Sequence, residues 1–247
     1  MNILAFASRK GGSGKSTLAA HIAAYAYATN RSCLLVDDDP QGSLTLWNDL
    51  RRKTALPLKT VKRRTADVLE KAQRHGIEWV LIDTPANASA CVVEAMEAAT
   101  LVIIPCRPGL FDIEAVQETI ELARHVRTPY IVVLNGAAPK RHEIESPAVT
   151  SVRHCLARLE APVWGGQITH RASFSFSIGR GASEYDSDSG SVTEISRLWQ
   201  AIEKSVAVIN GASKKTPCAV SRHKILAGTA PLWERAINSS RAASALC

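Results

Sequence analysis

The feature that most constrains this chain is a glycine-rich turn near its start, where residues 8–17 read Ser-Arg-Lys-Gly-Gly-Ser-Gly-Lys-Ser-Thr. The apolar residues 2–8 before it predict a strand, and residues 16–29 after it, rich in alanine and stopped at Asn30, predict a helix. Glycines between a strand and a helix let successive backbone N–H groups turn toward an anion, and the helix N-terminus adds a partial positive charge. This arrangement predicts a loop that binds phosphate groups.

Short apolar runs alternate with helical patterns along most of the remaining chain. Their continuous apolar character suits strands buried on both faces, and we expect such strands at residues 32–37, 78–83, 100–105, 129–135 and 163–169. Helices are expected at residues 112–126 and, with Ser146 as N-cap, at residues 147–159; Ser191 and Glu194 form a capping box ahead of a last helix. The alternation predicts an α/β fold, with a doubly wound, mostly parallel sheet of about seven strands flanked by helices.

After Asn210 the helical pattern decays into Gly, Ser, Thr, Ala and basic residues. We therefore expect one domain over residues 1–210 and a basic, poorly ordered tail over residues 211–247. Most of the net charge of +7 lies in that tail, whose balance is +5 against +2 for residues 1–210. A second concentration, seven Lys and Arg without an acid, lies in residues 51–64. Such a run is more often a solvated face than a nucleic-acid surface.

The composition excludes several other classes of protein. With 46% hydrophobic and 21% charged residues, the chain has enough apolar material for a sizeable core. No stretch approaches the ~18 uninterrupted apolar residues of a membrane span, and residues 3–7 are too short for a signal peptide. The six cysteines are far apart and lack metal-ligand spacing, so neither a disulfide framework nor a zinc site is indicated. We expect a soluble, cytoplasmic protein.

Two further strands deliver carboxylates to the edge of the sheet where the phosphate loop is expected. The apolar runs at residues 34–37 and 80–83 end in Asp37 and Asp83. Open α/β sheets bind ligands at the carboxyl ends of their strands. In the loop, Lys15 would reach the β and γ phosphates and the Ser16 hydroxyl would hold Mg²⁺. Together these residues predict a metal–nucleotide site.

The phosphate loop departs from the ordinary pattern at two positions, because Arg9 replaces a glycine and Lys10 adds a second lysine. The form Lys-Gly-Gly-x-Gly-Lys-Ser resembles the deviant Walker A motif of the ParA/MinD ATPases, a class of P-loop NTPases. Residues 34–43 resemble the Walker A′ motif of ParA, with Asp-Pro-Gln-Gly at its end, and residues 80–85 resemble its Walker B motif. The likeness continues through residues 98–108, 132–135 and 168–186, and covers residues 2–209 in all.

The resemblance implies that the chain binds ATP and Mg²⁺ and hydrolyses ATP to ADP and phosphate. It implies catalytic roles for Lys10, Lys15 and Asp39: Lys10 would cross the interface of an ATP-bound homodimer, and Asp39 would position or activate the attacking water. Mg²⁺ would be held by Ser16, Asp37 and Asp83. Contacts to ATP would come from Lys10, Gly11, Gly12, Ser13, Gly14, Lys15, Ser16, Thr17, Pro108 and Asn135, the last of these at the adenine base.

Residues 84–87 stand where the family has its switch II segment, so hydrolysis would relax the dimer. Turnover would be slow until a ParB-like or adaptor protein stimulates it. Arg171 and Arg180 lie in a segment that resembles the part of ParA that contributes DNA-binding arginines. The resemblance therefore implies non-specific, salt-sensitive binding to duplex DNA, a nucleoid-associated protein, and the partition of a plasmid or chromosome or the positioning of a protein cargo.

Three alternatives stay open. A MinD-like membrane-surface switch that positions division machinery would need a C-terminal amphipathic helix, for which residues 232–237 are a faint candidate, so we expect no stable membrane association. A reductase similar to nitrogenase iron proteins would need paired cysteines around a cluster, and Cys91 and Cys106 lack the expected surroundings. A ligase similar to dethiobiotin synthase is disfavoured by Lys10 and by the Asp-Pro-Gln-Gly form.

Overall fold

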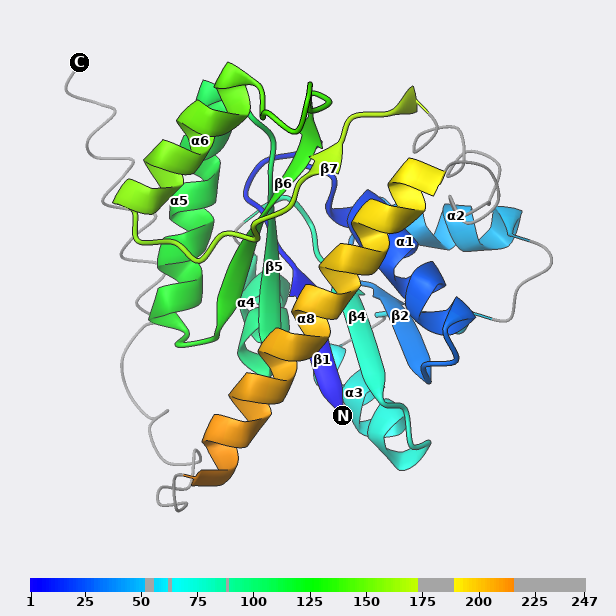
Figure 1. Ribbon diagram of the computed structural model, residues 1–247. Coiled ribbons are helices and arrows are strands. Elements are labelled where there is room, and N and C mark those ends of the chain that lie inside the picture. Colours follow the sequence, from blue (N-terminus) through cyan, green and yellow to red (C-terminus); the bar gives the residue numbers. More distant parts are fainter. Residues whose placement is uncertain (52–55, 62–63, 88, 173–188, 216–247) are drawn as a thin grey trace. The chain divides into compact units, whose positions relative to one another are not determined.

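The computed structural model describes residues 1–51, 56–61, 64–87, 89–172 and 189–215 (Figure 1). Within them, seven parallel strands form one sheet in the order β3-β2-β4-β1-β5-β6-β7. The strands are β1 (Asn2–Phe6), β2 (Cys33–Asp37), β3 (Leu58–Thr60), β4 (Trp79–Asp83), β5 (Leu101–Cys106), β6 (Tyr130–Ala137) and β7 (Ile168–Thr169). The predicted α/β fold with a parallel sheet of about seven strands is confirmed.

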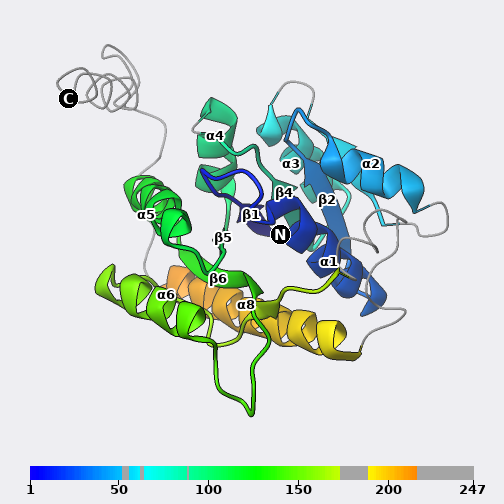
Figure 2. The same cartoon turned by 90° about the horizontal axis from the view of Figure 1, so that it is seen from above.

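Helices cover both faces of the sheet. They are α1 (Lys15–Ala28), α2 (Ser43–Leu50), α3 (Thr65–Arg74), α4 (Ala90–Ala98), α5 (Leu110–His125), α6 (Pro147–Arg158) and α8 (Ser189–Lys215). One apolar core contains residues of α1, α2 and α8, and the other contains residues of α3, α4, α5 and α6. Figure 2 shows α1 and α8 on one side of the sheet and α3, α4 and α5 on the other.

The two helix layers follow from the handedness of the crossovers. From β1 the chain moves toward one edge, through β2 to β3, and then returns to β4 and continues toward the other edge. Because parallel β–α–β connections are right-handed, helices that accompany opposite directions of travel lie on opposite faces. The sheet is therefore doubly wound, and the carboxyl ends of the central strands are left open between the layers.

Successive side chains in a strand alternate between the two cores. In β1, Leu4 and Phe6 pack with α1 and α8, whereas Ala5 packs with the opposite layer. In β4, Leu81 and Ile82 divide in the same way. In β2 and β4 every side chain before the terminal aspartate is apolar, because each is buried on one face or the other.

All six strands expected from the sequence are present, with two differences of substance. The strand expected at residues 163–169 is confined to β7; Val163 makes only an isolated bridge to Val132. The seventh strand, β3, had no strong signal because two of its three side chains are exposed. Helices α2, α3 and α4 were not expected either.

The last helix differs most from its prediction. The expected capping box is wrong, because α8 begins at Ser189 and Ser191 lies inside the helix, fully buried. The Glu194 carboxylate instead accepts hydrogen bonds from the backbone N–H (2.9 Å) and hydroxyl (2.7 Å) of Thr169. The helix also runs on to Lys215, past the expected boundary at residue 210. By contrast, the Ser146 cap of α6 and the left-handed Asn30 after α1 (φ 61°) are confirmed.

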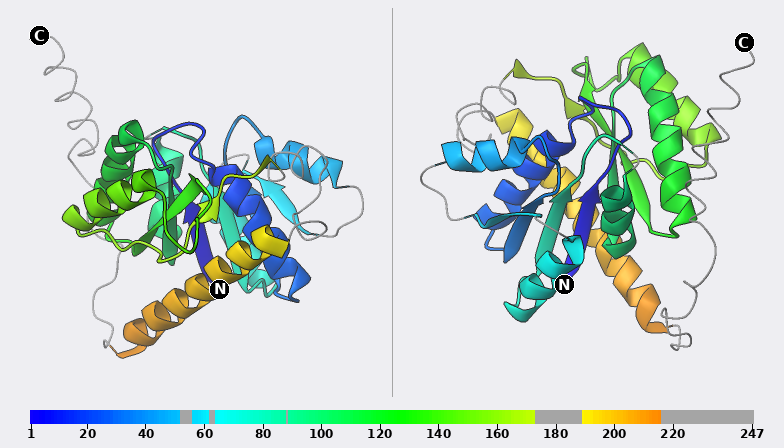
Figure 3. Two further views of the ribbon diagram at one scale, coloured as in Figure 1. Left: turned by 45° about the horizontal axis from the view of Figure 1, so that its top comes forward. Right: turned by 180° about the vertical axis from the view of Figure 1, so that it is seen from behind.

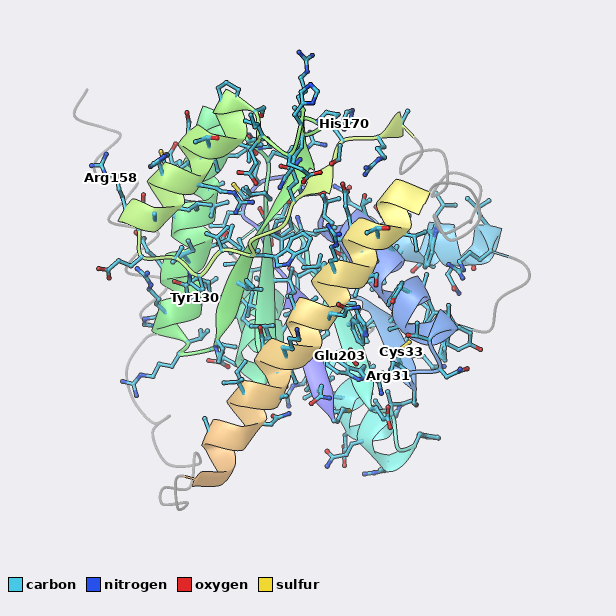
Figure 4. All side chains as sticks on the ribbon, in the orientation of Figure 1. Arg31, Cys33, Tyr130, Arg158, His170 and Glu203 are labelled. Carbon is cyan, nitrogen blue, oxygen red and sulfur yellow. The ribbon has the colours of Figure 1, made fainter. Side chains whose placement is uncertain are left out.

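Aromatic and ionic contacts fix α8 to the sheet. The rings of Trp199 and Trp79 lie 4.7 Å apart between centroids, tilted by 58°. Figure 4 shows Glu203 of α8 beside Arg31, with which it forms an ion pair of 2.6 Å. These contacts hold α8 against the start of β4 and the turn before β2.

The chain divides into one unit of Met1–Gly211 and a second of Ala212–Cys247. The structure describes only the first four residues of the second unit, so the expected tail lies mostly outside the described residues. None of the described helices combines the length and apolar character needed to cross a membrane.

Candidate functional site

The glycine-rich turn joins the end of β1 to the start of α1, as predicted. Gly14 adopts φ 98°, and a Cβ there would lie 2.1 Å from Nδ2 of Asn135. Glycine is therefore required for both the conformation and the space. The Asn135 amide donates a hydrogen bond of 2.8 Å to the Ser13 carbonyl, which holds the turn against the end of β6. Asn135 thus supports the loop directly, and its contact with adenine stays a prediction.

The acidic strand ends meet beside this turn. Asp37 at the end of β2 is in register with Asp83 at the end of β4, and the Asp38 N–H donates to the Asp83 carbonyl at 3.0 Å. Asp83 is fully buried, and neither of its carboxylate oxygens has a hydrogen-bond partner of good geometry among the described residues. Burial raises the pKa of Asp83 to about 7, although the nearby Ser16 hydroxyl and Lys15 ammonium lower it in part. A buried, ionised carboxylate without hydrogen-bond partners is stabilised by a cation bound next to it.

Lys15 lies at the start of α1 and is only 6% exposed. Burial lowers the pKa of its ammonium, and the charges of Asp83 and Asp39 act in the opposite direction. The Lys15 ammonium and the Asp83 and Asp39 carboxylates therefore lie close enough to influence one another's charge. A phosphate bound there would replace the water that these charges have lost.

Asp37 has a different environment from that of Asp83. Its Oδ2 accepts hydrogen bonds from the backbone N–H (2.8 Å) and hydroxyl (2.7 Å) of Thr45 in the first turn of α2. Its Oδ1 accepts from the Asp39 N–H at 3.3 Å. In this structure Asp37 orders the turn between β2 and α2, and its expected place in the Mg²⁺ shell stays a prediction.

The next acid, Asp38, links the strand end to α3. Its carboxylate accepts a hydrogen bond of 3.0 Å from the hydroxyl of Thr65, the first residue of α3. Burial raises the pKa of Asp38 to about 6; the Thr65 bond opposes this shift, and Glu94 and the neighbouring aspartates add to it. Asp38 therefore has a structural partner, unlike Asp83.

A pocket of about 680 Å³ opens beside these groups. Its lining comes from the phosphate loop, from the turn that contains Asp39 and Gln41, from α2 and from the segment after β4. The lining residues are Gly11, Gly12, Gly14, Lys15, Ser16, Thr17, Ala20, Asp39, Pro40, Gln41, Ser43, Leu44, Trp47, Pro85, Ala86, Asn87 and Arg107. Most of the residues expected at the nucleotide are thus gathered here, and a volume of this size is typical of small-molecule sites.

The donor set of the pocket fits a nucleotide polyphosphate with Mg²⁺. The loop offers backbone N–H groups at a helix N-terminus, and Lys15 offers a buried ammonium. The Ser16 hydroxyl and the Asp83 carboxylate oxygens are hard oxygen ligands of the kind that Mg²⁺ prefers, directly or through water. The residues would therefore hold both groups.

Lys10 does not line the pocket. Its Nζ forms an ion pair of 2.9 Å with Asp112 in the first turn of α5. The preceding Arg9 pairs with Glu118 of the same helix at 2.8 Å and its N–H donates to the Thr119 hydroxyl at 3.2 Å. The start of the phosphate loop is thus tied to α5, on the side away from the acidic strand ends.

Of the remaining expected residues, Pro108 lies outside the pocket lining and the segment after β4 lies in it. Pro108 is half-buried and does not line the pocket, whereas its neighbour Arg107 does. The segment after β4 is anchored by the Thr84 hydroxyl, which donates a hydrogen bond of 2.8 Å to the Phe6 carbonyl of β1. Pro85, Ala86 and Asn87 then line the pocket, as a switch segment would.

Of the two arginines expected to bind DNA, the structure describes only Arg171. Arg171 forms a two-point ion pair with Glu194 of α8, at 2.7 and 3.1 Å. Arg180 lies outside the described residues. Both assignments stay predictions, and Arg171 would need to exchange Glu194 for a phosphate.

Sequence reasoning missed three polar residues that order the site, namely Thr45, Thr65 and Asp112. Thr45 and Thr65 begin helices that were not expected, and Asp112 is about a hundred positions from Lys10 in the chain. A threonine near a helix start is a local signal for capping, but it does not identify an aspartate partner on another strand. Asp37 and Thr45 meet across the turn between β2 and α2, whereas only the folded arrangement brings Asp38 to Thr65 and Lys10 to Asp112.

Comparisons with known proteins agree with this site. Residues 4–184 match the CobQ/CobB/MinD/ParA nucleotide binding domain family (CbiA). A "Maintenance of carboxysome distribution protein A" of Gloeobacter kilaueensis is 35% identical over 123 residues, 49% of this chain and 56% of that protein. The protein of the same name from Halothiobacillus neapolitanus is 28% identical over 191 residues, 74% of this chain and 86% of that protein. The match therefore spans little more than half of the first relative and most of the second.

Among solved structures, the MinC:MinD cell division protein complex of Aquifex aeolicus has a chain that superposes with a TM-score of 0.67 at 18% identity. The superposition covers 90% of this chain and 99% of that one. At this identity the likeness shows a shared fold.

Proposed function

The chain belongs to the CobQ/CobB/MinD/ParA nucleotide-binding family, and from that premise we propose that it is an ATPase that partitions DNA or positions a protein cargo. It binds ATP with Mg²⁺ in the pocket beside the phosphate loop and hydrolyses it slowly to ADP and phosphate. The ATP-bound form is a homodimer that binds duplex DNA without sequence preference. A partner protein of the ParB or adaptor type accelerates hydrolysis and releases the dimer from DNA.

The observation that carries this proposal is the convergence of Lys15, Ser16 and Asp39 on one pocket, with the Asp83 carboxylate buried beside Lys15. Among the described residues neither Asp83 oxygen has a hydrogen-bond partner of good geometry, and Lys15 is almost fully buried beside this carboxylate. Mg²⁺, when bound, supplies positive charge that neutralises the phosphate oxygens. Lys15 binds the same phosphates, and Asp39, half-buried at the wall of the pocket, orients the attacking water.

Lys10 supports the dimeric part of the proposal. In the single chain its ammonium is held by Asp112 and lies outside the pocket lining. To act on the phosphates of a second subunit, it must leave Asp112. An added cation at the transferred phosphoryl group stabilises the transition state as an arginine finger does, so dimerisation and catalysis would be coupled through this lysine.

The cargo is the least constrained part of the proposal. The two relatives are named for the maintenance of carboxysome distribution, and the family includes ParA. These names support a positioning role and leave a DNA molecule or a protein assembly as the cargo.

A gel shift with Asp39→Ala protein and non-specific duplex DNA tests the proposal, because this variant should bind ATP without consuming it. We expect a shift with ATP, none with ADP or without nucleotide, and a loss of the shift at high salt. Light scattering of the same samples should show a dimer only with ATP.

Absence of DNA binding in every nucleotide state would contradict the DNA part of the proposal. Sedimentation with anionic liposomes in the same nucleotide states then distinguishes a membrane-surface switch from a protein-only switch. Absence of ATP hydrolysis by the unaltered chain, with and without DNA, would contradict the ATPase itself.

A further inference from the structure

A second hollow, of about 660 Å³, lies at the β3 edge of the sheet on the face covered by α3. It shares no lining residue with the nucleotide pocket. Its walls come from β3, from α3 and from the turn after α3. Figure 3, in its right-hand view, shows α3 and α4 in front of the strands on this face. We call this hollow the β3–α3 groove.

The floor of the β3–α3 groove is apolar. Leu34 and Ala72 are buried members of the core between the sheet and α3, and Val68 and Ile77 are half-buried at its border. Helix α3 places Val68 and Ala72 one turn apart, so both side chains face the hollow. The groove therefore continues the core out to the surface, where apolar side chains of another molecule would be shielded from water.

The rim of the groove is basic. Lys59 comes from β3, Lys71 from the last turn of α3 and His75 from the residue after it, and all three are exposed. Among the ion pairs formed by the described residues, none involves Lys59 or Lys71. Arg64 reaches Glu94 only at 3.7 Å. Since Asp67 is the one acid among the described residues that line the groove, these residues give it an excess of positive charge.

The strand beside the groove is an edge strand. The β2 backbone bonds to Pro57 (Leu35 N–H to Pro57 carbonyl, 2.9 Å) and to Val61 (Val61 N–H to Asp37 carbonyl, 3.1 Å). In a parallel ladder alternate residues face one neighbour, so the N–H and C=O groups of Leu58 and Thr60 point away from β2. An extended segment that lies along β3 can pair with these groups and direct every second side chain into the groove.

We propose that the β3–α3 groove binds an extended, acidic peptide segment of a partner protein. The apolar floor takes alternate side chains, and Lys59 and Lys71 take the carboxylates between them. A nucleic acid fits less well. Sites for nucleic acids place cations along the phosphate backbone and aromatic rings under the bases, whereas the floor of this groove is lined by aliphatic side chains. The proposal also gives a role to the basic run at residues 51–64, of which Lys59 and Arg64 are members.

The test is fluorescence anisotropy with a labelled synthetic peptide of alternating glutamate and leucine, measured on the full chain without nucleotide. We expect saturable binding that weakens as salt is added, and affinity lower by about tenfold or more for a peptide in which lysine replaces glutamate. Binding should be unchanged in Lys15→Gln protein. This control separates failure of the groove from failure of the nucleotide site.

The variant that tests the rim is the double substitution Lys59→Glu and Lys71→Glu, which should lower the affinity by about tenfold or more. The matched control is Arg127→Glu with Lys204→Glu, which changes the net charge equally at exposed residues outside the groove. Val68→Thr keeps the shape of the floor but adds a hydroxyl, and should weaken binding without altering the salt dependence. Thermal unfolding of each variant verifies that it folds.

Three outcomes would overturn the proposal. The glutamate peptide could fail to bind, or the groove and control variants could weaken binding equally, which would indicate attraction by net charge alone. Duplex DNA could displace the peptide, with DNA binding lost in the Lys59→Glu and Lys71→Glu protein, which would make the groove a nucleic-acid surface.

Discussion

The hollow at the phosphate loop and the β3–α3 groove have nearly equal volumes, about 680 and 660 Å³, and they place their charges in opposite ways. At the phosphate loop the charged groups are buried: Lys15 is 6% exposed and Asp83 fully buried. At the groove the charged groups are exposed on a rim above a buried apolar floor. Because the charged side chains are buried in one hollow and exposed in the other, the two hollows suit different ligands.

Buried charges without partners are costly, and the cost is recovered only when a ligand supplies the missing charge. The phosphate-loop pocket is therefore suited to a small, highly charged ligand with its metal ion. Exposed lysines cost little and attract acidic partners weakly, over a distance limited by salt screening. The groove is therefore suited to a flexible segment whose affinity comes mainly from its apolar side chains.

The largest expected effect that separates the hollows is that of Lys15→Gln. Removing one buried charge that contacts phosphate should weaken ATP binding by about a hundredfold or more, equivalent to about 3 kcal/mol. Peptide binding at the β3–α3 groove should not change. Titration calorimetry with ATP and Mg²⁺ measures the first effect, and retained ATP hydrolysis by the variant would contradict the assignment of the loop.

Asp39→Ala should separate binding from chemistry within the pocket. Loss of a group that orients or activates water should lower the hydrolysis rate by about a hundredfold or more, whereas ATP should still bind. Phosphate release and nucleotide binding are measured on the same protein. Asp38→Asn is the matched control, because Asp38 already has Thr65 as a partner and should leave turnover nearly unchanged; an equal loss in both variants would remove Asp39 from this role.

Asp83→Asn tests whether burial of charge destabilises the pocket before a ligand binds. The folded-state pKa of Asp83, about 7, is above its ordinary value of 3.8, so between these values the folded chain holds a proton that the unfolded chain has lost. The nucleotide-free chain should therefore lose stability as pH rises through this window. An asparagine side chain is never ionised, so it avoids the cost of burying a charge. The melting temperature of the Asp83→Asn protein should therefore exceed that of the unaltered chain by several degrees at about pH 8.

The pH dependence provides the control for this prediction. The difference in melting temperature should shrink as the pH falls below the ordinary pKa of 3.8, where Asp83 is protonated in both states. With saturating ATP and Mg²⁺ at about pH 8, the unaltered chain should have the higher melting temperature of the two proteins, because the Asp83 carboxylate then helps to hold the bound Mg²⁺. A difference independent of pH would contradict the proposed cause.

The smallest effect is expected for Asp112→Asn, which removes the ion pair that holds Lys10. The pair is partly exposed and contributes at most about 1 kcal/mol. Its loss should tighten ATP-dependent dimerisation by a few-fold, measured by light scattering in the Asp39→Ala background. Glu118→Gln, which breaks only the neighbouring ion pair of Arg9, should leave dimerisation unchanged; an equal effect of both would point to a general loosening of the loop.

The elements of the central sheet were predictable because their signals are local. Strands β1, β2, β4, β5 and β6 each contain a continuous run of apolar residues, and the phosphate loop lies between β1 and α1 as its glycines require. Strand β3 and helices α2 to α4 were missed, since β3 exposes two of its three side chains and the helices are short. Strand β3 lies at the edge of the sheet, where its half-exposed positions leave a weaker apolar pattern than those of the central strands.

The positions of the site residues were also predictable where the signal is local, and not where it depends on contacts between distant residues. Lys15, Ser16 and Asp39 line the pocket, as the motifs implied. Asn135 reaches the loop by a hydrogen bond to the Ser13 carbonyl, and Asp37 is paired with Thr45, contacts that no motif indicates. The capping box at Ser191 was wrong because Glu194 is drawn to Thr169 and Arg171, which approach α8 only in the folded chain.

By itself, the sequence determined the alternation of strands and helices, the phosphate loop and the carboxylates at the ends of β2 and β4. These depend on residue order, because apolar runs, glycines and strand-end acids act over a few neighbouring positions. The tertiary structure decided which charges lost water without gaining a partner, that Lys10 meets Asp112, and that β3 and α3 leave a basic groove between them. Burial and pairing depend on elements brought together from distant parts of the chain, so only the folded arrangement distinguishes Asp83 from its neighbours.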